Sequence, residues 1–425
     1  MTERRRHSHQ GQTITPPGST PSGRHGVVVF ADTEPFTCFL QFAAALRRRG
    51  VVCVRVTTRA RTTRQRAAQI MQRLVFRRVD VLLGVAHDGS VTGVDLLADW
   101  LEGVAVAVEA SDDVAAALAA RSSSAGDHRL LKTRAGRLES VLYDKWELMQ
   151  FAQSVGVSVP TSWRDADASD TSYPLLVKPR LGFGGQGIRR VGDRAEQEQV
   201  VADLSLPIGG FFAQEVMAGD RINLGGVAKA GRIVAVGCYW SWPRADDPMG
   251  PPGLVAMTHS PQLIEAGERL IASLDYTGAF CLNFIQGPGG RPHLIDFNSR
   301  LFGSWLALQR AGVDIIGAYL HAYDLNAGAQ PRSEETADHP QRWLPDSMAI
   351  STAARVTGVV SPHAINRRTI SLLGTRWLII VCAQRAASTL WRLLSAPILR
   401  RSTPDGGHGT AGRSASPSGS VSPTR

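Results

Sequence analysis

Lysine is the residue that this sequence most nearly lacks. Only four of its 47 basic residues are lysine (Lys132, Lys145, Lys178 and Lys229), and the other 43 are arginine. The net charge of +10 would suit a nucleic-acid-binding protein. However, so strong a preference for arginine is typical of codon composition, and no zinc finger or RNP-like aromatic pattern accompanies it. We therefore expect no nucleic-acid partner, and we treat each lysine as informative.

Paired cysteines and long apolar runs are also missing. The five cysteines stand alone without a C-x-x-C pair, which excludes a disulfide scaffold or zinc ribbon and predicts a reducing, cytoplasmic location. No apolar segment typical of a signal peptide occurs near the N-terminus. The apolar run Trp377–Ala383 is too short for a membrane span of roughly 20 residues. We expect the basic amphipathic segment 375–401 to pack on the protein, with peripheral membrane contact as the alternative.

Changes in composition divide the chain into five expected parts. The two ends are rich in Pro, Gly, Ser, Thr and Arg, which predicts disordered tails. Between them we expect an α/β domain, an α+β domain and a helical extension. The expected boundaries are 1–25 (tail), 26–132 (α/β domain), 133–330 (α+β domain), 331–401 (helical extension) and 402–425 (tail).

Strand and helix patterns alternate in the first of these domains. Apolar runs typical of buried strands occur at 26–31, 51–56, 79–86 and 104–110. Amphipathic stretches separate them, including an Arg-rich segment at 59–78 that favours a solvated helix face over a phosphate-binding one. Alternating apolar strands and helices predict a parallel sheet covered on both faces.

From Tyr143 onward the pattern changes to antiparallel strands. A helix is expected to begin after Asp144, which is a good N-cap residue, and to end near Gly156. Hairpin signals follow at Ala230-Gly231 and at 287–290. The expected strands contain the sequences PLLVKP, GIRRV, GFFAQEVM, RINLGGVAKAGRIVAVGCYW and AFCLNFIQGPGGRPHLIDFN. A further helix is expected from about Ser260 to Asp275.

The stretch LLVKPRLGFGGQGIRRV contains a G-x-G-x-x-G pattern at Gly182, Gly184 and Gly187. A Rossmann fingerprint needs a helix to begin at the glycines, whereas IRRVGD has strand character. A Walker A loop needs Gly-Lys-Ser/Thr, and a protein kinase places its glycine loop before the strand lysine. None of these patterns fits, because Lys178 precedes the glycines.

A flexible hairpin fits the same residues. Only glycine lets the backbone come close to a ligand, so the N–H groups of Gly184, Gly185 and Gly187 could close over a triphosphate. Lys178, on the preceding strand, would add a positive charge. The stretch therefore predicts a glycine flap over a nucleotide.

A second polar group occurs in HLIDFNSRLFGS. Period-two alternation along a strand would place Asp296, Asn298 and Arg300 on one face. A carboxylate and an amide oxygen are suitable ligands for Mg²⁺ that bridges nucleotide phosphates, and an arginine suits an acyl phosphate. Asn283, on the strand before, could add another oxygen.

In these four segments the chain resembles the ATP-grasp enzymes. The resemblance is carried by Lys145 in YDKWELMQFAQSVGVSVP, Lys178 in VKPRLGFGGQGI, FAQEVMAGD and LIDFNSRLFGS, and it covers about residues 26–330. It implies an ATP-grasp fold, an α/β plus α+β chain in which a parallel-sheet pre-ATP-grasp domain comes first. GAFCLN followed by the D-x-N-x-R strand most resembles the carbamoyl-phosphate-synthetase-like branch.

The resemblance also implies a role for each matching residue. Lys145 and Lys178 would contact the ATP phosphates, while Arg300 would hold an acyl phosphate. The remaining implied contacts are adenine at Gln214, Glu215 and Val216, the ribose at Asp220, and two Mg²⁺ ions at Asp296, Asn298 and Asn283.

Three residues depart from the family pattern. Asp296 replaces a longer glutamate, Asn283 is one methylene shorter than the glutamine of the branch, and Arg221 stands where a ribose-binding glutamate is expected. These departures allow weaker ATP binding or a partly degenerate site.

The leading functional hypothesis is an ATP-dependent ligase that joins a small-molecule carboxylate to an amine, in small-molecule or natural-product biosynthesis. Two alternatives stay open: an enzyme that hands an acyl or carboxy phosphate to a partner, and a nucleotide-binding protein that has lost turnover. His259, Trp240 and Trp242 are weaker candidates for the substrate pocket, and a homodimer is an open alternative to a monomer.

Overall fold

The computed structural model describes most of the chain between residues 27 and 325. The described residues are 27–33, 37–60, 66, 69, 72, 73, 75–86, 90–101, 106–125, 132, 133, 139–164, 172–182, 184–204, 209–244, 247–287, 289–325, 342 and 343. Both expected tails lie outside this set, as does the expected helical extension apart from residues 342 and 343. The same applies to the segment 375–401 and to half of the Arg-rich segment 59–78.

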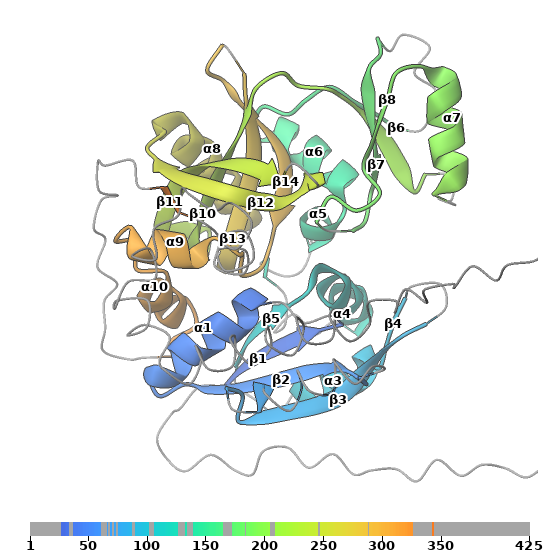
Figure 1. The fold of residues 1–425 in the computed structure, drawn as a ribbon. Helices are drawn as coiled ribbons and strands as arrows, with labels where there is room; N and C mark the ends of the chain where they lie inside the picture. The colour runs from blue at the N-terminus through green and yellow to red at the C-terminus, as the bar shows by residue number, and fades with distance from the viewer. Residues whose placement is uncertain are drawn as a thin grey trace, which may run out of the picture.

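A five-stranded sheet forms the lower part of the molecule in Figure 1. Its strand order is β4-β3-β2-β1-β5, and β1, β2, β3 and β5 run parallel, as the sequence predicts. The short β4 is antiparallel to β3 and was not predicted. The bounds are β1 Val27–Asp32, β2 Val52–Thr58, β3 Arg78–Val85, β4 Val91–Thr92 and β5 Val106–Ala110.

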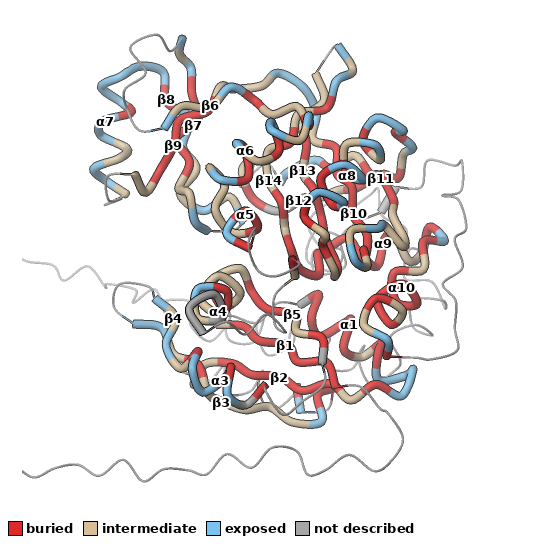
Figure 2. The backbone as a smooth tube through the Cα atoms, turned by 180° about the vertical axis from the view of Figure 1, so that it is seen from behind, coloured by how far each residue is buried: buried red, intermediate tan, exposed pale blue. Residues whose placement is uncertain are grey.

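Helices cover both faces of this sheet because successive strand residues point to opposite sides. Phe30 contacts Phe39 of α1 (Thr37–Arg48), with ring centroids 5.5 Å apart. Val29, on the other face, shares a core with α3 (Val94–Leu101) and α4 (Asp112–Ala125). Figure 2 shows the resulting layer of buried backbone between the helices.

A six-stranded antiparallel sheet forms the centre of the second part, in the order β14-β13-β10-β11-β12-β15. At the turn between β10 and β11, Ala230 and Gly231 have φ values of 46° and 73°, the backbone that a tight hairpin requires. Both predicted hairpins are confirmed. The bounds are β10 Asp220–Lys229, β11 Arg232–Arg244, β12 Asp247–Thr258, β13 Gly278–Gln286, β14 Pro292–Asn298 and β15 Arg342–Trp343.

One face of the six-stranded sheet packs against α8 (Pro261–Leu274), which begins after the N-cap Ser260 and ends at Asp275 as predicted. Part of the other face packs against α9 (Trp305–Arg310) and α10 (Ile315–Ala322). The same apolar cluster includes α1, so the two sheets share one core.

A third sheet has four strands in the order β6-β9-β7-β8 and lies at the upper right of Figure 1, beside α7. Two short helices, α5 and α6, lie between it and β14 (Figure 1). The bounds are α5 Glu139–Tyr143, α6 Lys145–Ser154, β6 Ser162–Arg164, β7 Leu175–Pro179, β8 Arg189–Val191, α7 Arg194–Asp203 and β9 Phe211–Glu215.

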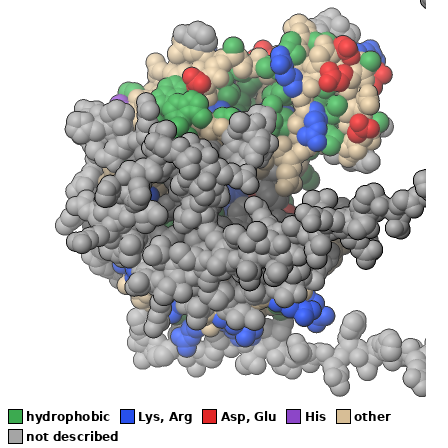
Figure 3. Space-filling view, viewed as in Figure 1, with side chains coloured by type: hydrophobic (Ala, Val, Ile, Leu, Met, Phe, Trp, Pro, Cys, Tyr) green, Lys and Arg blue, Asp and Glu red, His purple; other side chains and the backbone are tan. Residues whose placement is uncertain are grey.

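The basic side chains visible on the surface do not form one continuous patch on the face seen in Figure 3. On the face seen in Figure 3, Lys and Arg side chains of the described residues lie in separate groups in the upper part and along the lower edge. In the upper part they alternate with acidic side chains. Within the described part of the chain, every helix is too short or too polar to span a bilayer.

Candidate active site

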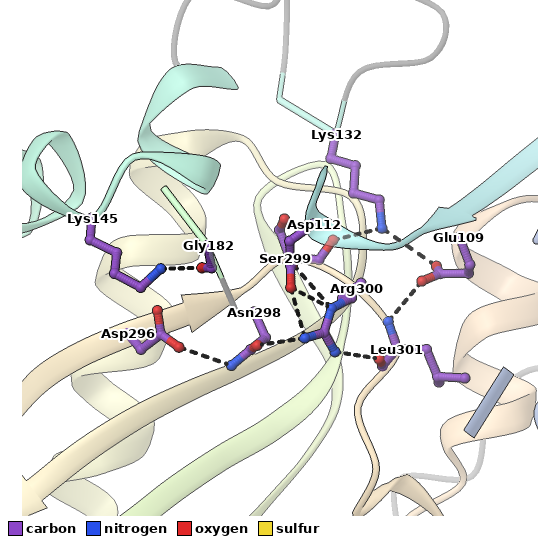
Figure 4. A network of polar contacts seen from close by, with 10 residues as sticks. All are labelled: Glu109, Asp112, Lys132, Lys145, Gly182, Asp296, Asn298, Ser299, Arg300 and Leu301. Atoms are coloured by element: carbon purple, nitrogen blue, oxygen red, sulfur yellow. Dashed lines mark hydrogen bonds and ion pairs between the residues drawn. The ribbon is translucent and has the colours of Figure 1, made fainter. Parts of the chain in front are cut away.

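The first turn of α6 is fixed to the glycine stretch. Asp144 Oδ1 accepts the Trp146 N–H at 2.9 Å, which confirms the predicted N-cap. The guanidinium of Arg180 holds the same carboxylate, with Nη2 2.6 Å from Oδ2. Because of this pairing Lys145 starts the helix beside the glycine stretch, and its amino group donates to the Gly182 carbonyl (Figure 4).

Lys178 lies on β7 and is buried. Its Nζ donates to Gln214 Oε1 at 2.5 Å, and Gln214 Nε2 donates to Ser162 Oγ at 3.0 Å. Burial lowers the pKa of Lys178 to about 8, although the nearby carboxylate of Asp296 acts in the opposite direction. Lys145 also lowers this pKa, so the two lysines and Asp296 share one electrostatic environment.

The glycine stretch is a hairpin between β7 and β8, as predicted. Gly184, Gly185 and Gly187 all have positive φ values, of 64°, 75° and 73°. The short strand β8 follows, and no helix begins at Gly187. A Cβ on Gly185 would lie 2.1 Å from the Met249 carbonyl oxygen, so the hairpin tip contacts the long β11–β12 hairpin and leaves no room there for a side chain.

Three of the four residues expected to contact adenine and ribose lie on β9 or directly after it, and the fourth, Asp220, is the first residue of β10. Gln214 is buried and bonded to Lys178, while Glu215 Oε1 accepts the Thr161 N–H at 2.9 Å. Val216 is 36% exposed and Asp220 is exposed. Two of the four side chains are therefore used inside the small sheet and two face solvent.

A polar row crosses one face of the six-stranded sheet. Asn283 pairs with Asp296 on one side and with Asn223 on the other. Asn223 Nδ2 donates to Ser241 Oγ at 2.7 Å. Opposed residues in antiparallel strands point to the same face, which places Asn223, Asn283 and Asp296 together. Ser241 is opposed to Arg221 and joins this row through its hydrogen bond to Asn223. Asn298 is two residues beyond Asp296 and shares the face, as the sequence predicts.

Arg300 lies beyond β14, which ends at Asn298. The alternation argument for its direction therefore does not apply, but its guanidinium still reaches the expected side, because Nη2 donates to Asn298 Oδ1 at 3.0 Å. Three further bonds join it to Asp112, a residue of the first α/β unit (Figure 4).

One small cavity is lined by some members of both predicted groups. Outside its lining are Lys178, Gly184, Gly185, Gly187, Asn283 and Arg300. Its lining combines Lys145 and Gly182, from the lysine and glycine group, with Asp296 and Asn298, from the D-x-N-x-R group. Asp112 and the α5–α6 junction complete it. Segments that are far apart in the sequence therefore meet at this cavity.

The oxygen donors at this surface can be compared with the needs of Mg²⁺. In proteins Mg²⁺ is held by one or two carboxylates together with substrate phosphates. Asp296 supplies one carboxylate, and Asn298 and Asn283 supply amide oxygens. Among the described residues no cluster of three His, Cys, Asp or Glu side chains is present. These three oxygen ligands suit a Mg²⁺ ion that is also bound by the phosphates of a nucleotide. They are too few and too weakly charged to suit an ion bound by the protein alone.

Trp240 and His259 lie elsewhere. They line a separate cavity of about 300 Å³ together with Ile222 and the start of α8. Ile222 and Asn223 are adjacent on β10 and point to opposite faces, so this cavity is on the side of the sheet away from the polar row. Trp242 is 37% exposed. The structure thus favours packing and surface positions for these residues over the substrate pocket.

Sequence reasoning missed several residues of the site. Asp112, Glu109 and Lys132 all reach the end of β14, and Asn223 completes the polar row. Lys132 had a usable signal, because lysine is rare in this chain. Asn223 stands alone as a polar residue in the apolar run INLGG, which was a second signal. Asp112 and Glu109 had none, since their contacts are made with residues 188 and 192 positions away.

Comparison with known proteins supports the architecture. Residues 142–304 match the family model described as an ATP-grasp domain. No curated protein matches the chain by sequence.

Several solved structures share the fold. The L-amino acid ligase of Bacillus licheniformis aligns at 16% identity over 75% of this chain and 78% of its own, with a TM-score of 0.53. N5-carboxyaminoimidazole ribonucleotide synthetase in complex with ADP aligns at 11% identity over 79% and 86%, with a TM-score of 0.58. The biotin carboxylase domain of Hydrogenobacter thermophilus 2-oxoglutarate carboxylase, solved with MgADP and bicarbonate, aligns at 16% identity over 72% and 71%, with a TM-score of 0.56. Residues 142–304 are therefore an ATP-grasp domain, and the chain has the ATP-grasp fold.

Proposed function

We propose that this protein is an ATP-dependent carboxylate–amine ligase that releases ADP and phosphate. The observation that carries the proposal is the cavity whose lining joins Lys145 and Gly182 to the Asp296–Asn298 strand end. Lys178 is not part of this lining, but the charges of Lys145 and Asp296 both act on its pKa. Cations and backbone N–H groups on one side and oxygen ligands on the other suit a nucleotide triphosphate. The ligases and carboxylases that share the fold support the same reaction class.

The proposed reaction needs positioning and charge stabilisation more than a protein nucleophile. A substrate carboxylate oxygen attacks the γ-phosphorus, and the bond from this phosphorus to the oxygen of ADP breaks. Lys145 and Lys178 offset the charge on the phosphate oxygens. The substrate amine then attacks the acyl carbon, phosphate leaves, and the amine nitrogen loses a proton to give the amide.

The resemblance to ATP-grasp enzymes supports a proposed role for each remaining residue. Arg300 stabilises the acyl phosphate, and Val216 and Asp220 face the adenosine, beside Gln214 and Glu215. Asp296, Asn298 and Asn283 hold Mg²⁺, two ions in the fullest case, which neutralises the phosphate charge when bound. Residues 26–132 form the pre-ATP-grasp domain and 133–330 the ATP-grasp domain, in a cytoplasmic enzyme of small-molecule biosynthesis.

The products of ATP test this proposal. Purified full-length protein is incubated with ATP, Mg²⁺ and panels of carboxylates and amines, and nucleotides and phosphate are measured. We expect ADP and phosphate only where both substrate types are present. AMP with pyrophosphate would contradict the ligase mechanism. ATP binding with no turnover on any panel would favour a nucleotide-binding protein that has lost turnover. The structural argument for this alternative is that Asp296 is the only carboxylate among the proposed Mg²⁺ ligands.

A further inference from the structure

The side chain of Arg300 is held from the other half of the chain. Its Nε lies 3.0 Å from both oxygens of the Asp112 carboxylate, and its Nη2 lies 2.8 Å from Oδ2. The same Nη2 donates to Asn298 Oδ1, and Nη1 donates to the Leu301 carbonyl at 3.3 Å. Both members of the ion pair are largely withdrawn from solvent, with side chains 11% and 18% exposed.

Two more side chains hold the backbone on either side of Arg300. Glu109, which is fully buried, accepts the Leu301 N–H at 2.7 Å. Lys132 Nζ donates to the Ser299 carbonyl at 2.8 Å and lies 3.5 Å from Glu109 Oε1. We call Glu109, Asp112 and Lys132 the 299–301 clamp, because each holds one of three consecutive residues (Figure 4).

The 299–301 clamp holds residues that lie beyond the end of strand β14. β14 ends at Asn298, so residues 299–301 receive no ladder hydrogen bonds to fix them. An arginine side chain is long and has many rotamers, whereas a bidentate carboxylate fixes both the position and the plane of its guanidinium. The Arg300 side chain is therefore already ordered before substrate binds, and its rotamer entropy need not be lost during the reaction.

We propose that Asp112 is a positioning residue that holds the guanidinium of Arg300 beside Asn298, in the orientation in which it contacts the phosphoryl group once this group has been transferred to the substrate carboxylate. Glu109 and Lys132 fix the backbone that carries it. The first α/β unit thereby completes a site whose other residues lie in the ATP-grasp domain. This inference rests on the proposed function, because it takes Arg300 as the residue that contacts the phosphoryl group.

Inorganic phosphate is the probe, added to full-length protein saturated with MgADP, and its affinity is measured by titration calorimetry. Asp112→Asn keeps the size of the side chain and removes its charge. We expect it to weaken phosphate binding by about 10- to 100-fold, by analogy with the loss of residues that orient metal ligands, and to leave ADP affinity unchanged. Asp112→Glu should recover part of the loss.

Asp113→Asn is the matched control. Asp113 is the next residue of α4 and contacts Thr33 of its own unit, so its removal changes the charge at the same helix end without touching Arg300. We expect phosphate affinity to stay at the wild-type value. Arg300→Lys should weaken phosphate binding, and adding Asp112→Asn to it should have little further effect.

Hydrogen exchange at Leu301 gives a readout that does not require a ligand. Asp112→Asn should speed exchange in peptides that cover 299–301, while Asp113→Asn should not. The inference is overturned if Asp112→Asn leaves both phosphate affinity and this exchange rate unchanged, or if wild-type protein binds MgADP but no phosphate. Wild-type protein that does not bind MgADP overturns the proposed function itself, and the inference with it. If Asp112→Asn does not fold, Asp112→Glu decides by the same two measurements.

Discussion

The amino group of Lys178 is buried on β7, and burial lowers its pKa to about 8. Its hydrogen bond to Gln214 satisfies one of three donors. A polyphosphate bound beside Lys178 would supply both further hydrogen-bond acceptors and negative charge. At the scale of single residues, this lysine is therefore suited to bind a further anion besides the nearby Asp296 carboxylate.

Lys178→Ala should reduce ATP affinity by at least about tenfold, because hydrogen bonds to charged groups contribute roughly 1.5–3 kcal/mol. Titration calorimetry with MgATP measures the change. Lys229→Ala is the control, since Lys229 contacts Asp324 at 2.7 Å and is partly exposed. Equal affinities for the two variants would remove Lys178 from the nucleotide site.

ATP binding should weaken as the pH rises through about 8. The free protein loses the Lys178 proton near this pH, and only the charged form attracts phosphate. Bound phosphate stabilises the charged form and raises the pKa, so binding between about pH 8 and 10 must take up a proton. Calorimetry at pH 8.5 in buffers of different ionisation enthalpy should show this uptake. It should disappear in Lys178→Met, and an equal uptake in that variant would contradict the assignment.

At the scale of elements, the glycine hairpin between β7 and β8 is shaped by its contacts as well as by its backbone. Gly184 and Gly185 both have positive φ values, which other residues adopt at a cost. Only Gly185 is pressed against Met249 of the β11–β12 hairpin, since nothing lies within 4 Å of a Cβ placed on Gly184. Substitutions at the two glycines therefore distinguish the effect of backbone strain, which both share, from the effect of the contact with Met249, which only Gly185 makes.

Gly185→Ala should displace the hairpin and lower ATP affinity, whereas Gly184→Ala should mainly cost the strain of the backbone, about 1 kcal/mol. Thermal unfolding and MgATP titration measure the two effects. An affinity loss in Gly184→Ala as large as in Gly185→Ala would show that contact with Met249 does not matter.

At the scale of the whole molecule, one apolar cluster joins the first α/β unit to the six-stranded sheet. Trp305 of α9 is fully buried, and its ring centroid lies 5.0 Å from that of Phe42 on α1. Phe42 also contacts Tyr319 of α10, at 4.9 Å. The relative placement of Asp112 and Arg300 depends on this core.

Trp305→Ala should lower the free energy of unfolding by about 3–5 kcal/mol, the usual cost of truncating a large buried aromatic residue. Trp242→Ala removes a partly exposed side chain and should cost much less. Urea unfolding followed by circular dichroism compares them. Similar midpoints for both variants would mean that this cluster does not join the two units.

The sequence by itself determined the local elements and the types of residue at the site. Asp144 and Ser260 cap the expected helices, and Ala230-Gly231 forms the expected turn, because caps and turns depend on side-chain and backbone chemistry a few residues apart. Lys145 and Lys178 could be predicted as candidate phosphate-binding residues because each lies in a recognisable local motif.

The tertiary structure alone decided what those residues meet. The row from Ser241 to Asp296 depends on the register of four strands, and the pairing of Asp112 with Arg300 depends on how two sheets pack. Contacts over such separations leave no periodic trace in the sequence, because either partner alone looks like an ordinary surface charge. The candidate nucleotide site is therefore predictable from local motifs, while the packing of the two units sets the geometry of Arg300.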